Sequence, residues 1–375
     1  MKIGYDAKRA FANFTGLGNY SRSTISNICM VFPENEYFLY TPKKVDEGDC
    51  DFIKDFRNVH IRGPKNIFYG TFSSAWRRFG IAADAAHDQI DLYHGLSHEI
   101  PDGIEKTNIK TVVTIHDLIF KRFPNYYKKV DRKIYDSKIK HAVKYAHQII
   151  AISEQTKKDI ITFYGVDESK IKVVYQACDA IFENKKSTET LNTIRSKYQL
   201  PNNFLLYVGT IEERKNALVI LESLLQLSSD TKLVMVGKKK SYGKIIDQYI
   251  KEHQLQDRVI QINQLEFEDL PSIYQLADLF IYPSKFEGFG IPIIEALHSG
   301  VPVIAAKGSC LEEAGGPDSQ YFDATDAGQL AKIIIHLQAD ETAKQNAVQK
   351  GKIYVEKFNS KKIAMELMKL YESIK

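Results

Sequence analysis

The chain has 375 residues, of which 44% are hydrophobic and 26% charged, and its formal net charge is only +4. This composition excludes an intrinsically disordered or collagen-like chain, and the length favours two domains over one. The near balance of charge argues neither for nor against a nucleic-acid partner, and no apolar run approaches the 18 residues that a transmembrane helix requires.

The cysteines and the first residues of the chain indicate the cellular compartment of the protein. The four cysteines are scattered and form no Cys-x-x-Cys pair, which fits a reducing environment and offers no zinc site. The chain starts directly with a short predicted strand, without the pattern of a signal peptide. We therefore expect a cytoplasmic protein whose membrane contact, if it has any, is peripheral and on the inner face of the plasma membrane.

In the first half, short apolar runs alternate with longer amphipathic stretches, which is the pattern of a parallel α/β sheet. The predicted strands are Lys2–Tyr5, Tyr37–Tyr40, Val59–Ile61, Leu92–His94, Thr111–Ile115, Gln148–Ile152 and Lys172–Tyr175. The predicted helices are about Gly18–Met30, Ser73–His87, Tyr127–Ala146 and Glu154–Tyr164.

A polar stretch, Asn184–Thr190, reads as an interdomain linker, and a second α/β cycle follows it. Its predicted strands are Phe204–Val208, Lys232–Val236, Val259–Ile262, Asp278–Ile281 and Val301–Ala305. Its predicted helices are Asn216–Leu227, Tyr242–His253, Asp269–Ala277, Ile291–Leu297 and the amphipathic Ser360–Ile374. We predict two doubly wound Rossmann-like domains, residues 1–183 and 184–358, with ligands at the carboxyl ends of their strands.

The segment Tyr282–Gly300 places two carboxylates, Glu287 and Glu295, on either side of a glycine-containing turn between a predicted strand and helix. The backbone N–H groups of Phe289 and Gly290 would lie at the positive end of that helix, where an anion binds well. One carboxylate can accept from sugar hydroxyls and the other from ribose hydroxyls, with a phosphate between them. This arrangement meets the requirements of a nucleotide-sugar site.

The same segment resembles the Glu-x7-Glu signature of the retaining glycosyltransferases of family 4, here from Glu287 to Glu295. The resemblance implies the GT-B fold, in which two Rossmann-like domains face each other across a cleft. It also implies that the donor binds mainly the second domain, the acceptor mainly the first, and that residues 359–375 pack back on the first domain. No metal or other cofactor is implied.

The predicted strand–loop–helix junction Val208–Asn216 carries Arg214 and Lys215 side by side at a helix start, which suits a diphosphate. It is similar to the family's Gly-Arg-x5-Lys clamp, with Lys215 at the position of the family lysine. Thr210 stands where the family usually has arginine, so we assign it at most a hydroxyl contact. We expect Lys215 to hold the leaving diphosphate with help from Arg214; a solvated basic helix start is the alternative.

Other positions acquire a role only through the resemblance. Gly16 and Gly18 match the amino-terminal glycine loop that approaches the donor phosphate, and Leu265 joins the donor-binding set. His116, at the end of a predicted strand with Asp117 beside it, would meet the donor sugar or the reacting centre. A histidine that only caps backbone groups is the alternative for His116.

Two spacings resemble metal sites, and we interpret both as structural. His94 and His98 have i, i+4 spacing, but Gly95 and the strand end disfavour a helix, so we expect a loop lining the cleft. Asp49 and Asp51 form the chain's Asp-x-Asp pattern in a polar loop rather than after an apolar strand. We therefore predict no metal site.

Basic residues interleave with aromatic ones in residues 73–80 and 120–144, including Trp76, Phe79 and the neighbouring arginines and lysines. They predict either a solvated helix face or a surface of the first domain that rests on anionic lipid headgroups. Nucleic acid fits less well, because the charge is near balance and no nucleic-acid motif is present.

Together these features predict a metal-independent retaining hexosyltransferase that moves a sugar, with GDP-mannose as the first guess, to a saccharide or lipid-linked acceptor in polysaccharide assembly. A nucleotide-sugar 2-epimerase shares the fold and remains an alternative, as does a non-catalytic nucleotide-sugar-binding module. Products formed from the donor alone would identify the epimerase, and the absence of turnover would identify the binding module.

Overall fold

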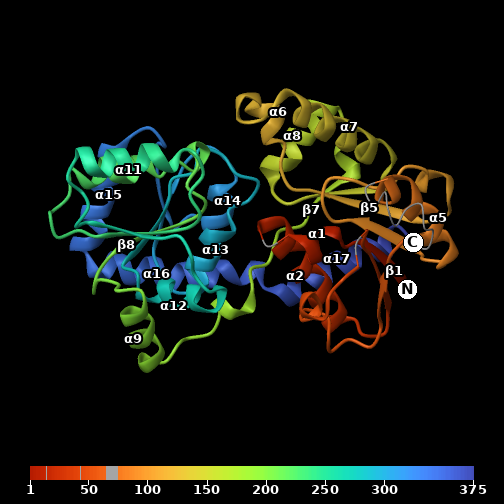
Figure 1. The fold of residues 1–375 in the computed structure, drawn as a ribbon, viewed down its shortest axis with the longest axis horizontal. Coiled ribbons are helices and arrows are strands. Elements are labelled where there is room, and N and C mark those ends of the chain that lie inside the picture. Colours follow the sequence, from red (N-terminus) through yellow and green to blue (C-terminus); the bar gives the residue numbers. More distant parts are fainter. Residues whose placement is uncertain (14, 43, 65–74) are drawn as a thin grey trace. The chain divides into compact units, whose positions relative to one another are not determined.

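The computed structural model describes residues 1–375 except 14, 43 and 65–74. The chain forms two compact units, and each is described by itself (Figure 1). Unit 1 consists of Met1–Ala177 and Asn359–Lys375, and unit 2 of Cys178–Phe358. Among the described helices, none is long and apolar enough to cross a membrane.

Unit 1 is built on a seven-stranded sheet in the order β3-β2-β1-β4-β5-β6-β7, and every neighbouring pair is parallel. Each strand predicted for the first half is present close to its predicted bounds. The strands are β1 Lys2–Asp6, β2 Glu36–Tyr40, β3 Val59–Arg62, β4 Leu92–Gly95, β5 Lys110–Ile115, β6 Gln148–Ala151 and β7 Ile171–Val173. The strand order reverses between β1 and β4, so the carboxyl ends of these two strands mark the position where ligands bind in doubly wound folds.

Helix α8 of unit 1 shows how capping residues set the ends of a helix. The hydroxyl of Ser153 accepts from the backbone N–H of Thr156 at the start of α8, and Gly165 ends that helix in the left-handed region. Among the described residues of unit 1, the α-helices are α1 Lys8–Ala12, α2 Gly16–Val31, α5 Ile81–His87, α6 Ile119–Arg122, α7 Lys129–Tyr145, α8 Glu154–Tyr164 and α17 Ser360–Ser373. The start of the predicted helix Ser73–His87 lies outside the described residues, and a π-helical turn, η2 (Trp76–Gly80), leads into α5.

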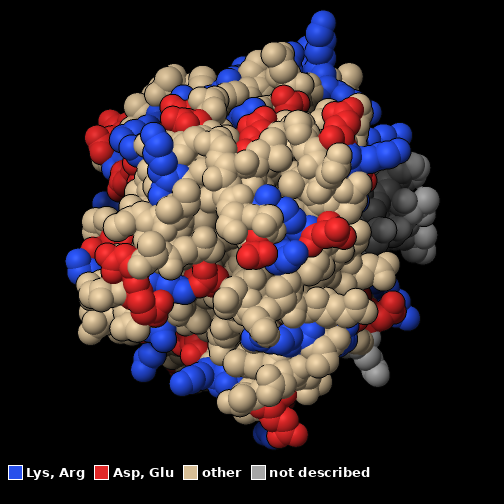
Figure 2. Space-filling view, turned by 90° about the vertical axis from the view of Figure 1, so that its left-hand side faces the viewer, with Lys and Arg blue, Asp and Glu red and all other residues tan. Residues whose placement is uncertain are grey.

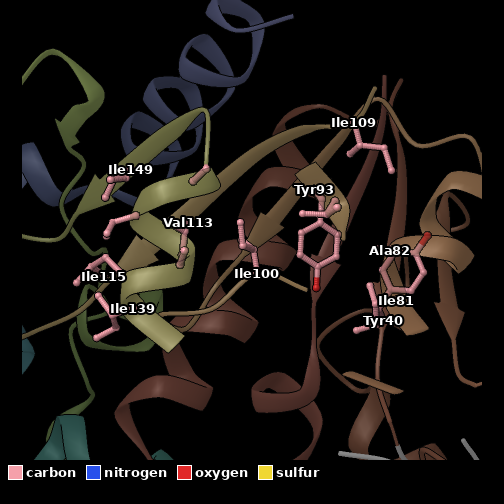
Figure 3. Packing of buried hydrophobic residues seen from close by; sticks show 14 of the residues in the cluster. Tyr40, Ile81, Ala82, Tyr93, Ile100, Ile109, Val113, Ile115, Ile139 and Ile149 are labelled. Atoms are coloured by element: carbon pink, nitrogen blue, oxygen red, sulfur yellow. The ribbon is translucent and has the colours of Figure 1, made fainter. Parts of the chain in front are cut away.

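Two apolar clusters cover the two faces of this sheet. Figure 3 shows one of them, in which Tyr93, Val113 and Ile115 of the strands pack against Ile81 of α5 and Ile139 of α7. The other contains residues of β1, α2 and the carboxy-terminal helix α17, including Leu367, Met368 and Tyr371. The last helix therefore belongs to the core of unit 1, although the chain reaches it only after completing unit 2.

Unit 2 contains a six-stranded parallel sheet in the order β10-β9-β8-β11-β12-β13. The strands are β8 Leu205–Val208, β9 Leu233–Val236, β10 Val259–Ile262, β11 Leu279–Tyr282, β12 Val303–Ala306 and β13 Gln320–Phe322. The helices are α9 Thr188–Lys197, α10 Leu218–Leu224, α11 Gly243–Glu252, α12 Leu270–Leu276, α13 Ile291–His298, α14 Leu311–Gly315, α15 Ala327–Ala339 and α16 Glu341–Val355. The order reverses between β8 and β11.

Unit 2 differs from the sequence-based prediction in several elements, among them α14, α15 and α16, where no helix was predicted. The stretch predicted as a linker contains the start of α9, because the hydroxyl of Ser187 caps the helix by accepting from the N–H of Thr190. The side-chain amide of Gln275 also binds this stretch, donating to the carbonyl of Asn184 and accepting from the N–H of Lys186, both at 2.9 Å. The edge strand β13 was not predicted, because three residues are too few to show a pattern.

Charged side chains of both signs are interspersed on the face of the molecule seen in Figure 2, where no large area carries a single sign. This mixture agrees with the formal net charge of +4. Within the face shown, the surface therefore offers no broad basic field of the kind that attracts nucleic acid.

Candidate functional site

The carboxyl ends of β8 and β11 carry the residues that the sequence singled out in unit 2. These strands are neighbours where the strand order reverses, so the loops that follow them lie side by side. The loop after β8 leads into a short 3-10 turn, η7 (Glu213–Lys215), and the loop after β11 leads to Glu287. The backbone N–H of Lys285 donates to the carbonyl of Arg214 at 3.0 Å, which holds the two loops together.

Glu287 is the centre of this cluster. One carboxylate oxygen, Oε1, lies 2.7 Å from the ammonium of Lys215 and accepts from the hydroxyls of Ser284 at 2.6 Å and Tyr282 at 3.2 Å. The other, Oε2, lies 2.8 Å from Nη1 of Arg214. The side chain of Glu287 is only 11% exposed, so this is a largely buried carboxylate between two cations.

The two cations have further partners that fix their positions. Arg214 donates from Nη1 to the carbonyl of Phe286 at 2.6 Å and from Nη2 to Glu212 at 2.8 Å. Lys215 donates to the hydroxyl of Tyr282 at 2.7 Å. Because each cation is hydrogen-bonded on more than one side, both are held in place before any ligand arrives.

The electrostatics of Glu287 follow from these contacts. Burial on its own would raise the pKa of Glu287, but the charges of Lys215 and Arg214 outweigh it and lower the pKa to about 2. In the same way, burial would lower the pKa of Arg214, and the charge of Glu287 raises it. Glu287 is therefore an ionised carboxylate near neutral pH, held between Lys215 and Arg214.

Glu295 occupies a different environment on α13. Its carboxylate accepts from the hydroxyl of Tyr274 at 2.9 Å, and burial raises the pKa of Glu295 to about 7. Gly290 precedes α13 with φ of 108°, a backbone conformation that favours glycine. The ring of the preceding Phe289 is buried against Phe358, with ring centroids 5.3 Å apart, so at Phe289 only the backbone is left to face a ligand.

The raised pKa of Glu295 predicts a pH dependence of nucleotide binding. If the ionised carboxylate accepts from ribose hydroxyls, affinity for a nucleoside diphosphate should fall as the pH drops below about 7, where Glu295 becomes protonated. Calorimetric titrations across this range measure it. The Glu295→Gln variant should bind the nucleoside diphosphate more weakly and should lose the part of the pH dependence that comes from Glu295. Any pH dependence that remains in the variant then comes from titration of the phosphate. An unchanged pH profile in the variant would remove Glu295 from the ribose site.

The raised pKa also has a consequence for folding. The carboxyl group of Glu295 is protonated more readily in the folded than in the unfolded state, so folding is favoured below the ordinary glutamate pKa of about 4.3. This contribution is lost as the pH rises through about 7. The stabilisation from protonated Glu295 therefore disappears in the same pH range in which Glu295 becomes ionised and able to accept from ribose hydroxyls.

The remaining residues predicted for the donor site have simpler surroundings. The carbonyl of Thr210 accepts from the hydroxyl of Tyr207 at 3.1 Å, and Leu265 lies half-buried in the loop after β10. In unit 1, Gly16 starts α2, and a Cβ at Gly18 would lie 1.7 Å from the carbonyl oxygen of Asn13. Gly18 is therefore required by close packing of its own loop, whatever it does toward a ligand.

His116 follows β5 and is buried within unit 1. Its Nε2 lies 2.8 Å from the carbonyl of Leu96, and its Nδ1 lies 3.1 Å from the side-chain amide of Gln176. Burial lowers the pKa of His116 to about 3, so the ring is neutral near neutral pH. The edge of Tyr20 lies against the ring, with centroids 4.6 Å apart. Sequence reasoning missed Gln176, which no motif marks, and Tyr20, which the Gly-x-Gly-x-Tyr pattern could have indicated.

The basic and aromatic stretch of residues 73–80 needs a correction. Trp76 is fully buried and donates to Asp84 at 2.7 Å, and Arg77 is buried in ion pairs with Asp6 and Glu99. Neither side chain can touch a membrane. The prediction failed because the partners of Arg77 come from β1 and the loop after β4, far away in sequence.

Asp51 and His94, one from each spacing that resembles a metal site, have partners within the protein. Asp51 pairs with Lys54 at 3.6 Å on the surface. His94 is buried between the hydroxyls of Tyr371 and Thr114, at 2.6 and 2.8 Å. Across the part of the chain that the structure describes, no group of three or more histidine, cysteine or acidic side chains is arranged to hold a metal ion.

Family models match both halves of the chain. Residues 36–180 match the model described as "Glycosyltransferase Family 4", and residues 192–354 match "Glycosyl transferases group 1". Among curated relatives, the O-antigen chain mannosyltransferase B of Escherichia coli is 27% identical, over 99% of this chain and all of that protein.

Solved structures share the fold over the whole chain. Sucrose-phosphate synthase from Thermosynechococcus elongatus has a TM-score of 0.80 at 20% identity, covering 100% of this chain and 98% of that one. The HepE protein of Anabaena, solved in complex with UDP, has a TM-score of 0.77 at 18% identity and covers both chains completely. With both units matched by glycosyltransferase family models and the fold shared with GT-B structures, the chain belongs to the GT-B glycosyltransferases, with a family 4 domain followed by a group 1 domain.

Proposed function

We propose that this glycosyltransferase moves mannose from GDP-mannose to a saccharide or lipid-linked acceptor, with retention of anomeric configuration. The choice of mannose is supported by the name of the full-length relative, an O-antigen chain mannosyltransferase. The variant of the phosphate clamp, Thr210-x3-Arg214-Lys215-Asn216, points the same way. Retention is implied by membership of family 4.

The observation that carries the proposal is the cluster of Arg214, Lys215 and Glu287 where the strand order of unit 2 reverses. A diphosphate placed there competes with Glu287 for the same two cations. Its arrival releases the carboxylate of Glu287, which is then free to accept from hydroxyls of the donor sugar. This exchange gives each of the three side chains a role in one donor site.

The transfer step uses the same cations. The bond between the anomeric carbon and the phosphate oxygen breaks, and negative charge grows on the departing diphosphate, where Lys215 and Arg214 stabilise it. The acceptor oxygen bonds to the same face of the sugar, and its proton passes to the departing phosphate. We also propose that His116 contacts the donor sugar. A sugar hydroxyl would then take the place of the Gln176 amide as the partner of Nδ1 of His116.

A screen of GDP-, UDP- and ADP-sugars by thermal shift tests the donor. The proposal expects GDP-mannose to raise the midpoint of unfolding most, since a ligand that binds only the folded state stabilises it. A larger shift with UDP-glucose, the ligand of one HepE structure, would overturn the choice of donor. Incubation with donor alone, followed by product analysis, distinguishes a transferase from an epimerase.

The proposal also assigns the diphosphate charge to protein groups rather than to a metal ion. Transfer should therefore persist in excess EDTA, because Arg214, Lys215 and the start of α13 supply the positive potential. Activity with and without EDTA measures this. Loss of activity that Mn²⁺ or Mg²⁺ restores would contradict it.

We also propose peripheral contact of unit 1 with an anionic membrane through α7, in place of the buried Trp76 and Arg77. Val130 and Ile134 are 67% and 47% exposed on this helix, and Lys128, Lys129 and Lys133 are exposed beside them. Apolar side chains between cations are typical of helices that lie in a membrane interface. The exposed Asp131 lies among them and weakens the positive field.

Vesicle sedimentation tests the membrane contact. Each cation near an anionic surface contributes about 1 kcal/mol, and this fades within about 8 Å at physiological salt. The protein should therefore sediment with anionic vesicles at low salt, detach at high salt and ignore neutral vesicles. The triple variant Lys128→Glu, Lys129→Glu, Lys133→Glu should lose sedimentation while leaving nucleotide affinity intact. Wild-type protein that ignores anionic vesicles at low salt would leave α7 a solvated face.

A further inference from the structure

Unit 1 contains a cavity of about 200 Å³ beyond the carboxyl ends of β1 and β4, where its own strand order reverses. Asp6 comes from the end of β1, Glu99 from the loop after β4, Arg77 from η2 and Lys138 from α7. Tyr93, which lies in the apolar cluster of Figure 3, also lines the cavity. A cavity of this volume holds on the order of ten waters, so a phosphate group or one sugar ring fits.

The carboxylates that line the cavity are already paired with cations. Asp6 is paired with Arg77, whose Nε lies 3.0 Å from Oδ2. Glu99 is paired with Arg77 and, at 2.8 Å, with Lys138. The third lining carboxylate, Asp102, accepts from Nε of Arg78 at 2.9 Å. The charges of these three carboxylates are thus balanced by the three cations paired with them, Arg77, Arg78 and Lys138.

Lys8 is the fourth lining cation, and within the described ranges it has no ion pair. It is half-buried at the start of α1. Burial lowers the pKa of Lys8, and the positive charges of Arg77 and Arg9 lower it further, while the carboxylates of Glu99 and Asp6 oppose the shift only in part. A half-buried ammonium beside other cations and without an ion pair of its own is destabilised, and an anion in the cavity would offset this.

Two residues that adjoin lining residues in the sequence each carry a buried polar atom without a hydrogen-bond partner among the described residues. These atoms are Nε of Arg9, next to Lys8 in α1, and Nδ1 of His98, next to Glu99. His98 also has φ of 66°, which is uncommon for a residue other than glycine. Buried polar atoms without partners and strained backbone both concentrate at ligand sites.

We infer that this cavity is an acceptor subsite of unit 1 and that it takes an anionic group of the acceptor, a phosphate or a carboxylate, on Lys8. The description of this ligand as acceptor rests on the proposed function. The binding itself does not, because the cavity is formed by unit 1 alone.

Fluorescence of Trp76, the one tryptophan of the chain, gives a reporter inside unit 1, next to Arg77 in the cavity wall. Inorganic phosphate, glucuronate and neutral glucose are titrated separately. The titrations use the full-length Lys215→Ala variant, which weakens the phosphate site of unit 2. We expect a saturable response to phosphate or to glucuronate and none to glucose. A response to phosphate alone indicates a phosphorylated or lipid-diphosphate acceptor, and a response to glucuronate alone an acidic saccharide.

Substitutions of Lys8 decide whether the response comes from this cavity. Lys8→Gln should weaken binding about tenfold, as expected when a charge-assisted hydrogen bond is lost. Lys8→Arg should retain most of the affinity, and Lys106→Gln, at an exposed lysine of the same unit, should match the parent. No saturable response to either anion, an equal response to glucose, or an unchanged affinity in Lys8→Gln would overturn the inference. None of these results would affect donor binding in unit 2, so the two proposals fail separately.

Discussion

Replacing Lys215 by alanine should lower kcat by at least about a hundredfold, because its ammonium stabilises charge that grows on the departing diphosphate. The structure places Nζ of Lys215 at 2.7 Å from both Glu287 and the hydroxyl of Tyr282, so the ammonium is already positioned for this role. Steady-state kinetics with a sugar acceptor and the donor found in the screen measure the change.

Two variants sharpen this prediction. Lys215→Arg should recover little activity, because the planar guanidinium does not fit the position of a compact ammonium between Glu287 and Tyr282. Lys244→Ala, at an exposed lysine of the same unit, should keep wild-type kcat. Near-normal kcat in Lys215→Ala would mean that Arg214 carries the charge stabilisation instead.

Replacing Glu287 by alanine should destabilise unit 2 by about 3–5 kcal/mol, because it leaves two largely buried cations without their shared carboxylate. The side chain of Arg214 keeps Glu212 as a partner, which favours the lower end of this range. Denaturant unfolding followed by circular dichroism measures the free energy of unfolding. Hydrogen exchange of peptides from unit 2 shows where protection is lost, since the tryptophan lies in the other unit.

The pH dependence provides an independent check of the Glu287 prediction. Since the pKa of Glu287 is lowered to about 2, its stabilising contribution is fully present above the ordinary glutamate value of about 4.3 and is lost as the pH falls toward 2. The stability difference between wild type and Glu287→Ala should therefore shrink in that window. Glu341→Ala, at an exposed acid of the same unit, should change stability little. A loss of under about 0.5 kcal/mol in Glu287→Ala would contradict the prediction.

Most strands of unit 1 could be predicted because they are short, buried apolar runs with clear boundaries, although the edge strands Val59–Arg62 and Ile171–Val173 are only partly buried. The family and the GT-B fold were also predicted, from the alternation of strands and helices and from the motif around Glu287, whereas the order of the strands in each sheet was not predicted. The edge strand Gln320–Phe322 and the helix Thr188–Lys197 could not be recognised, because one is too short to show a period and the other begins in polar residues.

The contacts of the site depended on tertiary structure. Arg77 and Asp6 are 71 residues apart in sequence, and Lys215 and Tyr282 are 67 apart. A basic residue in an amphipathic stretch looks the same whether it faces solvent or a buried carboxylate, and for this reason Arg77 was placed on a surface. The pairing of Glu287 with Lys215 and Arg214 was likewise invisible, although each of the three had been singled out by its motif.

The central claim is that Arg214 and Lys215 bind the diphosphate of a sugar nucleotide, and paired calorimetric titrations with GDP and guanosine test it most directly. Comparing the two ligands isolates the contribution of the phosphates in each protein. The account predicts that wild type binds GDP far more tightly than guanosine and that this difference largely vanishes in the double variant Arg214→Ala, Lys215→Ala. If the double variant keeps the full difference between GDP and guanosine, the diphosphate does not bind at these two residues and the account is wrong.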